Sequence, residues 1–262
     1  EFAGPVTALG EGVQGLSVGQ QVASLAGSGG LAEVAAVSAR TVVPVPEGLN
    51  SAEAAAFPVS YYTAYITLLT LGRAQQGETV LVQGAAGALG TALIQVGRAL
   101  GLKVVALASS EEKLAKAREL GADVTLLSER DDIVEAVREA SGGRGVNLLA
   151  EISGGAMFGR SLQMMANRGR VMVVGSASGE SAALDALTLM KKNLTVTGVW
   201  LSSMLTEPGV VQEALAFLTP LVASGQLRPQ IGPRYPLAES AQAFGDLQGR
   251  RTTGKVIIEP QR

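Results

Sequence analysis

The 262-residue sequence contains no cysteine and no histidine. Their absence excludes disulfides, thiol nucleophiles, zinc sites built on these ligands and histidine acid–base catalysis within this chain. Charged residues make up only 17% of the chain and the formal net charge is -2, which gives no electrostatic footprint for nucleic acid. No apolar run is long enough to span a membrane and no signal peptide is recognisable, so we expect a cytoplasmic protein. Any chemistry must then be supplied largely by a cofactor.

Hydrophobic residues are abundant at 47%, and the chain holds 33 glycines. This composition is typical of a folded α/β protein and excludes a disordered chain. A chain of this length can bury a full core, and it corresponds to one large domain or two ordinary ones. We expect two domains.

The stretch LVQGAAGALG combines a buried strand, three glycines and the start of a helix. The apolar, β-branched run Thr79–Val82 leads into Gly84, Gly87 and Gly90, and apolar residues recur at helical spacing over 91–100. Glycine allows the backbone to approach a pyrophosphate, and the N–H groups of the first helical turn then point at the anion. The spacing differs from the usual GxGxxG, so a tight turn that needs glycine only for packing is the alternative.

Strand and helix patterns alternate through the middle of the chain. The expected strands are 79–82, 103–108, 124–127, 146–151, 170–174 and 194–200. The expected helices between them are 91–100, 111–120, 131–140 and 157–165. This alternation predicts a parallel, doubly wound sheet with right-handed crossovers.

The two ends of the chain have a different, β-rich pattern. Short β runs are expected at 21–25, 31–37 and 42–46, and a helical connector divided by Pro58 follows, with Ser51 as its N-cap. Helices at 210–223 and 238–247 and a strand at 255–259 end the chain. We therefore expect a nucleotide-binding domain at residues 62–225, inserted into a β-domain of residues 1–61 and 226–262. Because the first residues are already strand-like, we expect that β-domain to be partial.

The end of the second strand of the nucleotide-binding fold favours NADP over NAD. An NAD site typically has an Asp or Glu about 20 residues beyond the glycines, where it binds the ribose 2′-hydroxyl. Ser109 and Ser110 stand at this position and Lys113 follows. Hydroxyls and a cation in place of a carboxylate suit a 2′-phosphate. The alternative is that the serines begin a capping box and that Lys113 faces solvent.

Two further pairs lie where ligands are expected to bind, and a third pair is basic. Gly175-Ser176 follows one strand of the predicted sheet and Gly154-Gly155 follows another, at the edge where parallel sheets present ligand contacts. Ordinary turn chemistry is the alternative for both. Arg250-Arg251 precedes the last strand, and a solvated turn is the better interpretation of this pair from the residues alone.

An ordered set of motifs runs through the whole chain. They are EFAGxV from Glu1, VGxxV from Val18, PEGL from Pro46, AAAFPVxYxTAY ending at Tyr65, GAAGALG from Gly84, SxEKxxxAxxLGA ending at Ala122 and TGKV from Thr253. Together they resemble the zinc-independent quinone oxidoreductases, the zeta-crystallin-like members of the medium-chain dehydrogenase/reductase superfamily. The resemblance implies a Rossmann domain inserted into a GroES-like β-domain, NADPH in the cleft between them and a homodimer.

The resemblance also assigns roles to individual residues. Thr63 matches a threonine near the nicotinamide, Lys113 matches a lysine at the 2′-phosphate, and Arg250 aligns with a cofactor-contacting arginine that Arg251 replaces if the register moves by one. The pyrophosphate loop corresponds to Gly87, Ala88, Leu89 and Gly90. The predicted cofactor site therefore comprises Thr63, Gly84, Gly87, Ala88, Leu89, Gly90, Ser109, Ser110, Lys113, Gly175, Ser176 and Arg250. Candidate walls of the substrate pocket, with ordinary packing as the alternative, are Tyr61, Tyr65 and Trp200.

The sequence departs from the family pattern at three places. Leu127-Ser128 stands where an Asn-Tyr pair is frequent, and Ala88-Leu89 replaces Gly-Val in the glycine loop. Members of the family begin well before the segment that matches Glu1, so we expect the β-domain to be N-terminally truncated.

The function that we expect is reduction of a quinone, or of another electron-poor conjugated carbonyl compound, by NADPH without a metal. No residue is assigned as a general acid, because a quinone yields a stabilised hydroquinone anion that solvent can protonate. An alkenal or enoyl-thioester reductase and a non-catalytic NADPH-binding module remain alternatives. A zinc alcohol dehydrogenase is the weakest of these hypotheses, since the chain has neither cysteine nor histidine.

Overall fold

A computed structural model describes residues 1–260 of the chain, and a six-stranded parallel sheet forms its centre. The strands are β4 (Thr79–Val82), β5 (Lys103–Ala108), β6 (Val124–Leu127), β7 (Val146–Glu151), β8 (Met165–Val173) and β9 (Thr195–Gly198). Their spatial order is β6-β5-β4-β7-β8-β9, with the crossover reversing beside β4. This is the strand order of a dinucleotide-binding fold, so the predicted doubly wound α/β sheet is confirmed.

Both faces of the sheet are covered by helices, and the central strands β4, β5 and β7 are mostly apolar and buried. The helices that alternate with them are α2 (Ala88–Ala99), α3 (Glu111–Glu119), α4 (Ile133–Ala140), α5 (Gly155–Met164) and α6 (Ala186–Lys192). Because neighbouring side chains of a strand point to opposite faces, Val80 and Val82 pack in one core cluster with Leu93 of α2. Leu81 packs in a second cluster with Ile133 of α4. The sheet is therefore buried on both sides.

A long helix, α1 (Ser51–Tyr65), precedes the sheet and continues into a π-helical turn at Ile66–Thr70. Its N-cap is Asn50, which forms a capping box with Glu53, so the predicted Ser51 cap is wrong by one residue. Pro58 lies inside α1 and does not divide it, contrary to the prediction. The N–H of Val59 donates to the Glu1 carboxylate at 2.7 Å, and burial of the helix outweighs the bond that proline removes.

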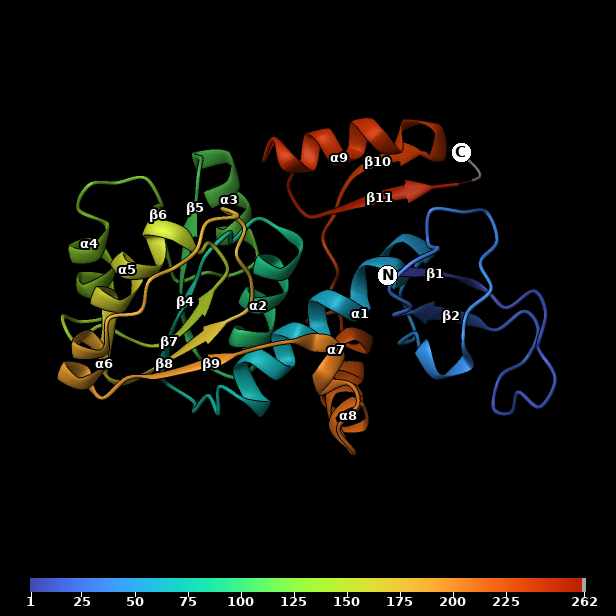
Figure 1. The fold of residues 1–262 in the computed structure, drawn as a ribbon, viewed down its shortest axis with the longest axis horizontal. Coiled ribbons are helices and arrows are strands. Elements are labelled where there is room, and N and C mark those ends of the chain that lie inside the picture. Colours follow the sequence, from blue (N-terminus) through green and yellow to red (C-terminus); the bar gives the residue numbers. More distant parts are fainter. Residues whose placement is uncertain (261–262) are drawn as a thin grey trace.

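In Figure 1 the N-terminal strands β1 (Phe2–Pro5) and β2 (Gln21–Ser24) lie on the other side of α1 from the parallel sheet, and β10 (Ile231–Pro236), β11 (Lys255–Glu259) and α9 (Ser240–Gln248) lie above α1. β1, β2 and β3 (Val42–Pro44) form an antiparallel sheet. β10 and β11 form a parallel pair covered by α9. α7 (Leu201–Met204) and α8 (Val210–Ala223) connect β9 to this part. The domain limits at 61/62 and 225/226 stay a prediction.

The structure corrects the prediction at several short segments. The β run expected at 31–37 is irregular; Leu31 and Val34 are exposed, and none of the strands at residues 1–260 pairs with this segment. The elements α6, α7 and β10 were not predicted. Two of them are very short, and β10 contains Pro233, which sequence patterns count against a strand. Among the helices of the described residues, none combines the length and apolarity needed to cross a bilayer.

Candidate functional site

The three glycines that follow β4 have three different local roles. Gly84 adopts a left-handed φ of 58°. A Cβ on Gly90 would lie 2.2 Å from the Gly84 carbonyl oxygen, so Gly90 allows α2 to pack closely against the end of the strand. Gly87 is exposed, and the nearest atom to an added Cβ there is the Gly84 oxygen at 3.3 Å. The fold therefore does not need glycine at position 87 for packing, and the missing side chain leaves the surface in front of the loop uncovered.

Gly87 is also the N-cap of α2, and this places a helix N-terminus beside that open surface. The N–H groups of the first turn, at Ala88, Leu89 and Gly90, have no acceptor within the helix, and the helix dipole gives this end a partial positive charge. Backbone N–H groups behind an exposed glycine are suited to bind a phosphate or pyrophosphate. The loop therefore has the strand, the glycine turn and the helix N-terminus that the sequence predicts, and its binding of a pyrophosphate stays a prediction.

Gln83, the last residue before the glycine loop, connects β4 to the loop that follows β7. Its side-chain oxygen accepts from the N–H groups of Ile152 and Ser153 at 3.1 and 3.2 Å, and its nitrogen donates to Ser161 Oγ at 2.7 Å. Gln83 is buried. Sequence reasoning missed this residue, although a polar side chain that ends an apolar strand is the available signal.

Glu151 ends β7 and is fully buried. Its carboxylate accepts from the N–H groups of Ser153 and Gly154 at 3.2 and 3.0 Å. Burial raises the pKa of Glu151, and the two backbone hydrogen bonds oppose the rise. Glu151, which belongs to none of the sequence motifs, therefore fixes the turn after β7 with a carboxyl group held out of water.

The loop after β8 lies against the turn that Glu151 fixes. The N–H of Ala177 donates to the Ile152 carbonyl at 2.8 Å, and a Cβ on Gly154 would lie 2.6 Å from Ser176 Oγ. Gly175 and Ser176 thus pack against 152–154 at the carboxyl edge of the sheet, the edge where the glycine loop also begins. Their contact with a cofactor stays a prediction.

Ser109, Lys113 and Arg250 come together although 137 residues separate the last two. Lys113 Nζ donates to the Arg250 carbonyl at 2.7 Å and lies 3.4 Å from Ser109 Oγ. Ser110 caps α3 by accepting from the Lys113 N–H at 3.3 Å, so the capping alternative describes Ser110. The Lys113 amino group instead turns toward Ser109, at the end of β5 where a 2′-phosphate is expected.

Arg250 and Arg251 differ in what holds them. The guanidinium of Arg251 donates to Asp246 Oδ1 from Nε at 3.0 Å and from Nη2 at 2.7 Å. Arg250 is exposed and has a left-handed φ of 55°. Because Arg251 is engaged in an ion pair, Arg250 is the better placed of the two to bind a ligand. This agrees with the family alignment that assigns the cofactor contact to Arg250 rather than to Arg251. The chain that follows Arg251 reaches the glycine loop, where the Gly254 N–H donates to the Ala86 carbonyl at 2.7 Å.

The remaining predicted residues lie on α1 and beyond β9. Thr63 is buried in α1, one turn after Ser60, which lines a narrow hollow with Ala88 at the start of α2. Tyr61 belongs to the core and stacks on Phe57 at 4.9 Å between ring centroids. Tyr65 packs against Phe217 at 5.6 Å, and Trp200 is 74% exposed. Packing accounts for both tyrosines, and the pocket role of all three residues stays a prediction.

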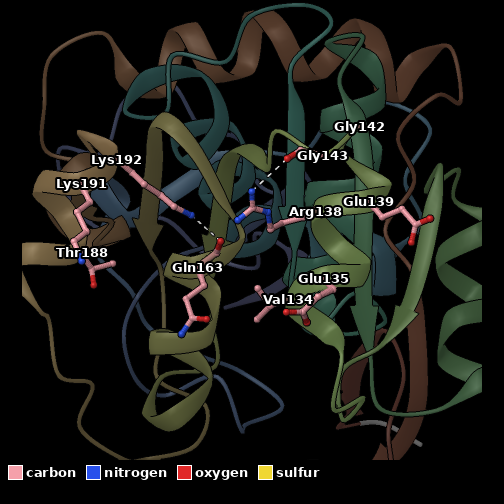
Figure 2. A pocket seen from close by; sticks show the side chains of 10 residues that line it. All are labelled: Val134, Glu135, Arg138, Glu139, Gly142, Gly143, Gln163, Thr188, Lys191 and Lys192. Atoms are coloured by element: carbon pink, nitrogen blue, oxygen red, sulfur yellow. Dashed lines mark hydrogen bonds between the residues drawn. The ribbon is translucent and has the colours of Figure 1, made fainter.

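A broad hollow lies at the opposite edge of the sheet, between α4, α5 and α6 (Figure 2). Its lining includes Arg138 and Glu139 of α4, Gln163 of α5 and Lys191 of α6. Loops that lead into the amino ends of β7 and β9 border it, whereas ligands of doubly wound sheets bind at the carboxyl ends. Its charges are of both signs, so we assign it no role in cofactor binding.

Known proteins are similar to this chain over most of its length. Residues 88–219 match the family model described as Zinc-binding dehydrogenase. Quinone oxidoreductase-like protein 2 of Bos taurus is 36% identical over 98% of this chain and 74% of its own length, and the quinone oxidoreductase of Sus scrofa is 34% identical over 98% and 78%. This chain belongs to the quinone oxidoreductase family. It is an oxidoreductase of the medium-chain dehydrogenase/reductase superfamily, as its motifs predict.

Solved structures of quinone oxidoreductases have the same fold. The enzyme of Thermus thermophilus, solved alone and with NADPH, has a TM-score of 0.83 and 43% identity over 94% of this chain and 78% of that one. The Escherichia coli quinone oxidoreductase complexed with NADPH has a TM-score of 0.90 and 28% identity over 98% and 80%. The Rossmann fold combined with a GroES-like β-domain is therefore confirmed.

The zinc in the name of the family model has no matching ligands in this chain. Zinc sites of dehydrogenases are built on cysteine and histidine, and the sequence has neither. Within residues 1–260 no three aspartates or glutamates gather into a group that could hold a metal ion. The residues present do not fit a zinc site.

Proposed function

We propose that this oxidoreductase transfers hydride from NADPH to a quinone, or to a similar conjugated carbonyl compound, without a metal. The observation that carries the proposal is the approach of Lys113 Nζ to Ser109 Oγ and the Arg250 carbonyl, beside a helix N-terminus suited to a pyrophosphate. The relatives named as quinone oxidoreductases, and the related structures solved with NADPH, support it.

The proposed cofactor site divides into two anion sites. The N–H groups of the first turn of α2 would hold the pyrophosphate, because they have no acceptor within the helix and Gly87, directly before them, is exposed, whereas Ala88 and Leu89 are half-buried. Lys113, Ser109 and the guanidinium of Arg250 would hold the 2′-phosphate. Charge-assisted hydrogen bonds from a lysine or an arginine to a phosphate are about twice as strong as neutral ones.

One carboxylate near the proposed 2′-phosphate site is held by an ion pair. Glu111, at the start of α3, accepts from Arg118 Nη2 at 3.1 Å. β5 ends at Ala108, and the next residue is Ser109. An NAD site typically has an aspartate or a glutamate at this position. The local electrostatics therefore favour NADPH over NADH.

The cofactor, when bound, supplies the hydride, and the residues of the chain bind and orient it. Gln83, at the end of β4, and Glu151, at the end of β7, both hold the loop after β7 in a fixed position by accepting from its backbone N–H groups, so this part of the carboxyl edge of the sheet is preorganised. No residue is assigned to polarise the acceptor or to donate a proton. A quinone needs neither from the protein, because hydride transfer gives a stabilised hydroquinone anion that takes its proton from solvent.

The experiment that tests the cofactor site is Lys113→Glu. It should weaken NADPH binding by about 1 to 3 kcal/mol, the range for a charge-assisted contact, and leave NADH nearly unchanged. Lys116→Glu is the matched control, because Lys116 lies on the same helix and pairs only with Glu119 at 3.3 Å in the contacts of the described residues. Equal affinity of the unmodified protein for NADPH and NADH would refute the proposed site.

A further inference from the structure

Asp246 lies at the centre of a small network that joins three segments of the C-terminal unit. The Tyr235 hydroxyl, on β10, donates to Asp246 Oδ2 at 2.7 Å. The Arg251 guanidinium donates twice to Oδ1, and its Nη2 also lies 3.3 Å from the Gly245 carbonyl. Hydrogen bonds from Tyr235 and Arg251 hold the pKa of Asp246 below its usual value, so the carboxylate is charged at neutral pH.

The network holds a turn that is unfavourable by itself. Arg250 has a φ of 55°, a left-handed conformation that is strained for a residue with a side chain. Its N–H donates to the Leu247 carbonyl at 3.1 Å, and the Arg251 N–H donates to the Asp246 carbonyl at 3.1 Å. Arg251 directly follows Arg250, and its side chain folds back to bind Asp246. This ion pair fixes the C-terminal end of the turn.

Both ends of the segment 250–254 touch the proposed cofactor site. The Arg250 carbonyl accepts from Lys113 Nζ at 2.7 Å, and the Gly254 N–H donates to the Ala86 carbonyl in the glycine loop at 2.7 Å. The conformation of this segment therefore sets where the Lys113 amino group is held. Any residue that fixes the turn acts on the proposed 2′-phosphate site without touching it.

We propose that Asp246 is a positioning residue for cofactor choice: through Arg251 it holds the Arg250 turn, and through the Arg250 carbonyl it orients Lys113 toward the 2′-phosphate of NADPH. The inference rests on the proposed function. When the Asp246 carboxylate is neutralised, Arg251 loses its charged partner, the left-handed turn relaxes and Lys113 loses one of the two oxygens that orient it. Binding of NADPH weakens, whereas NADH, which has no 2′-phosphate, binds as before.

The test is Asp246→Asn, with kcat/KM measured for NADPH and for NADH on the same quinone. The ratio of the two should fall about five- to tenfold, within the range of coupling between neighbouring residues, while the value for NADH changes by less than about twofold. Asp132→Asn is the matched control, because Asp132 forms a similar two-bond pair with Arg130 on the distant α4 side of the sheet. A parallel loss with both cofactors would show a merely structural role and overturn the inference.

A double-mutant cycle with Lys113→Ala separates this inference from the proposed function. If Asp246 acts through Lys113, Asp246→Asn should have little further effect on the cofactor ratio once Lys113 is removed. An undiminished effect in the Lys113→Ala background would overturn the inference and leave the proposed function standing. If Lys113→Ala alone leaves the ratio unchanged, the proposed 2′-phosphate site itself is refuted.

Discussion

Replacing Gly87 by valine should abolish cofactor binding and leave the fold intact. Gly87 has φ -77° and ψ 171°, an extended conformation that valine adopts readily. The nearest atom to the added Cβ is the Gly84 oxygen at 3.3 Å, and the position is exposed. We therefore expect the free energy of unfolding to change by about 1 kcal/mol or less, as for most surface substitutions.

The loss of binding should be much larger than the loss of stability. The valine methyl groups would lie in front of the first turn of α2, where the N–H groups would donate to the pyrophosphate. Hydrogen bonds to charged groups contribute about 1.5 to 3 kcal/mol each, so losing two of them lowers affinity by at least about 100-fold. Titration of each variant with NADPH, followed by fluorescence or calorimetry, measures this directly.

Two other glycines provide the controls for this experiment. Gly159→Val on α5 adds the same side chain where a Cβ has no atom within 4 Å, so it should leave NADPH binding unchanged. Gly90→Val should unfold the protein, because its Cβ would lie 2.2 Å from the Gly84 oxygen. The reasoning is refuted if Gly87→Val keeps its melting temperature and is still stabilised against heat by NADPH.

Three further predictions follow from the same structure. Quinone reduction should persist after prolonged EDTA treatment, because the chain has neither cysteine nor histidine to ligate zinc; loss of activity that added zinc restores would contradict this. Burial raises the pKa of Glu151, so the unmodified protein should lose stability relative to Glu151→Gln as pH rises above about 4, the usual carboxyl pKa, in urea unfolding, and a difference that stays constant with pH would refute it. Light scattering should give twice the mass of one chain, as expected for a homodimer. The mass of a single chain would refute this prediction.

The parallel sheet and the glycine loop could be predicted because their signals are local. The runs that became β4 and β5 are short, apolar and β-branched, as strands buried on both faces require, and the glycines follow β4 at once. Helix α2 then shows apolar residues at helical spacing over almost its whole length. Alternation of such elements leaves little freedom in the topology.

The rest depends on contacts between distant segments. Nothing near Asp246 in the sequence indicates that it accepts from Tyr235 and Arg251, and nothing near Gln83 indicates the turn at 152–153. Pro58 predicts a break locally, but the buried surroundings of α1 keep the helix continuous. These residues position the site without belonging to any motif, so only the folded structure brings them together.

The central claim is that this chain oxidises NADPH with a quinone as acceptor. The most direct measurement is steady-state oxidation of NADPH and of NADH by the purified protein, with a panel of quinones beside alkenals and enoyl thioesters. The account predicts turnover with quinones, a clear preference for NADPH and no dependence on added metal. Turnover confined to alkenals or enoyl thioesters, or binding of NADPH without oxidation on any acceptor, would contradict it.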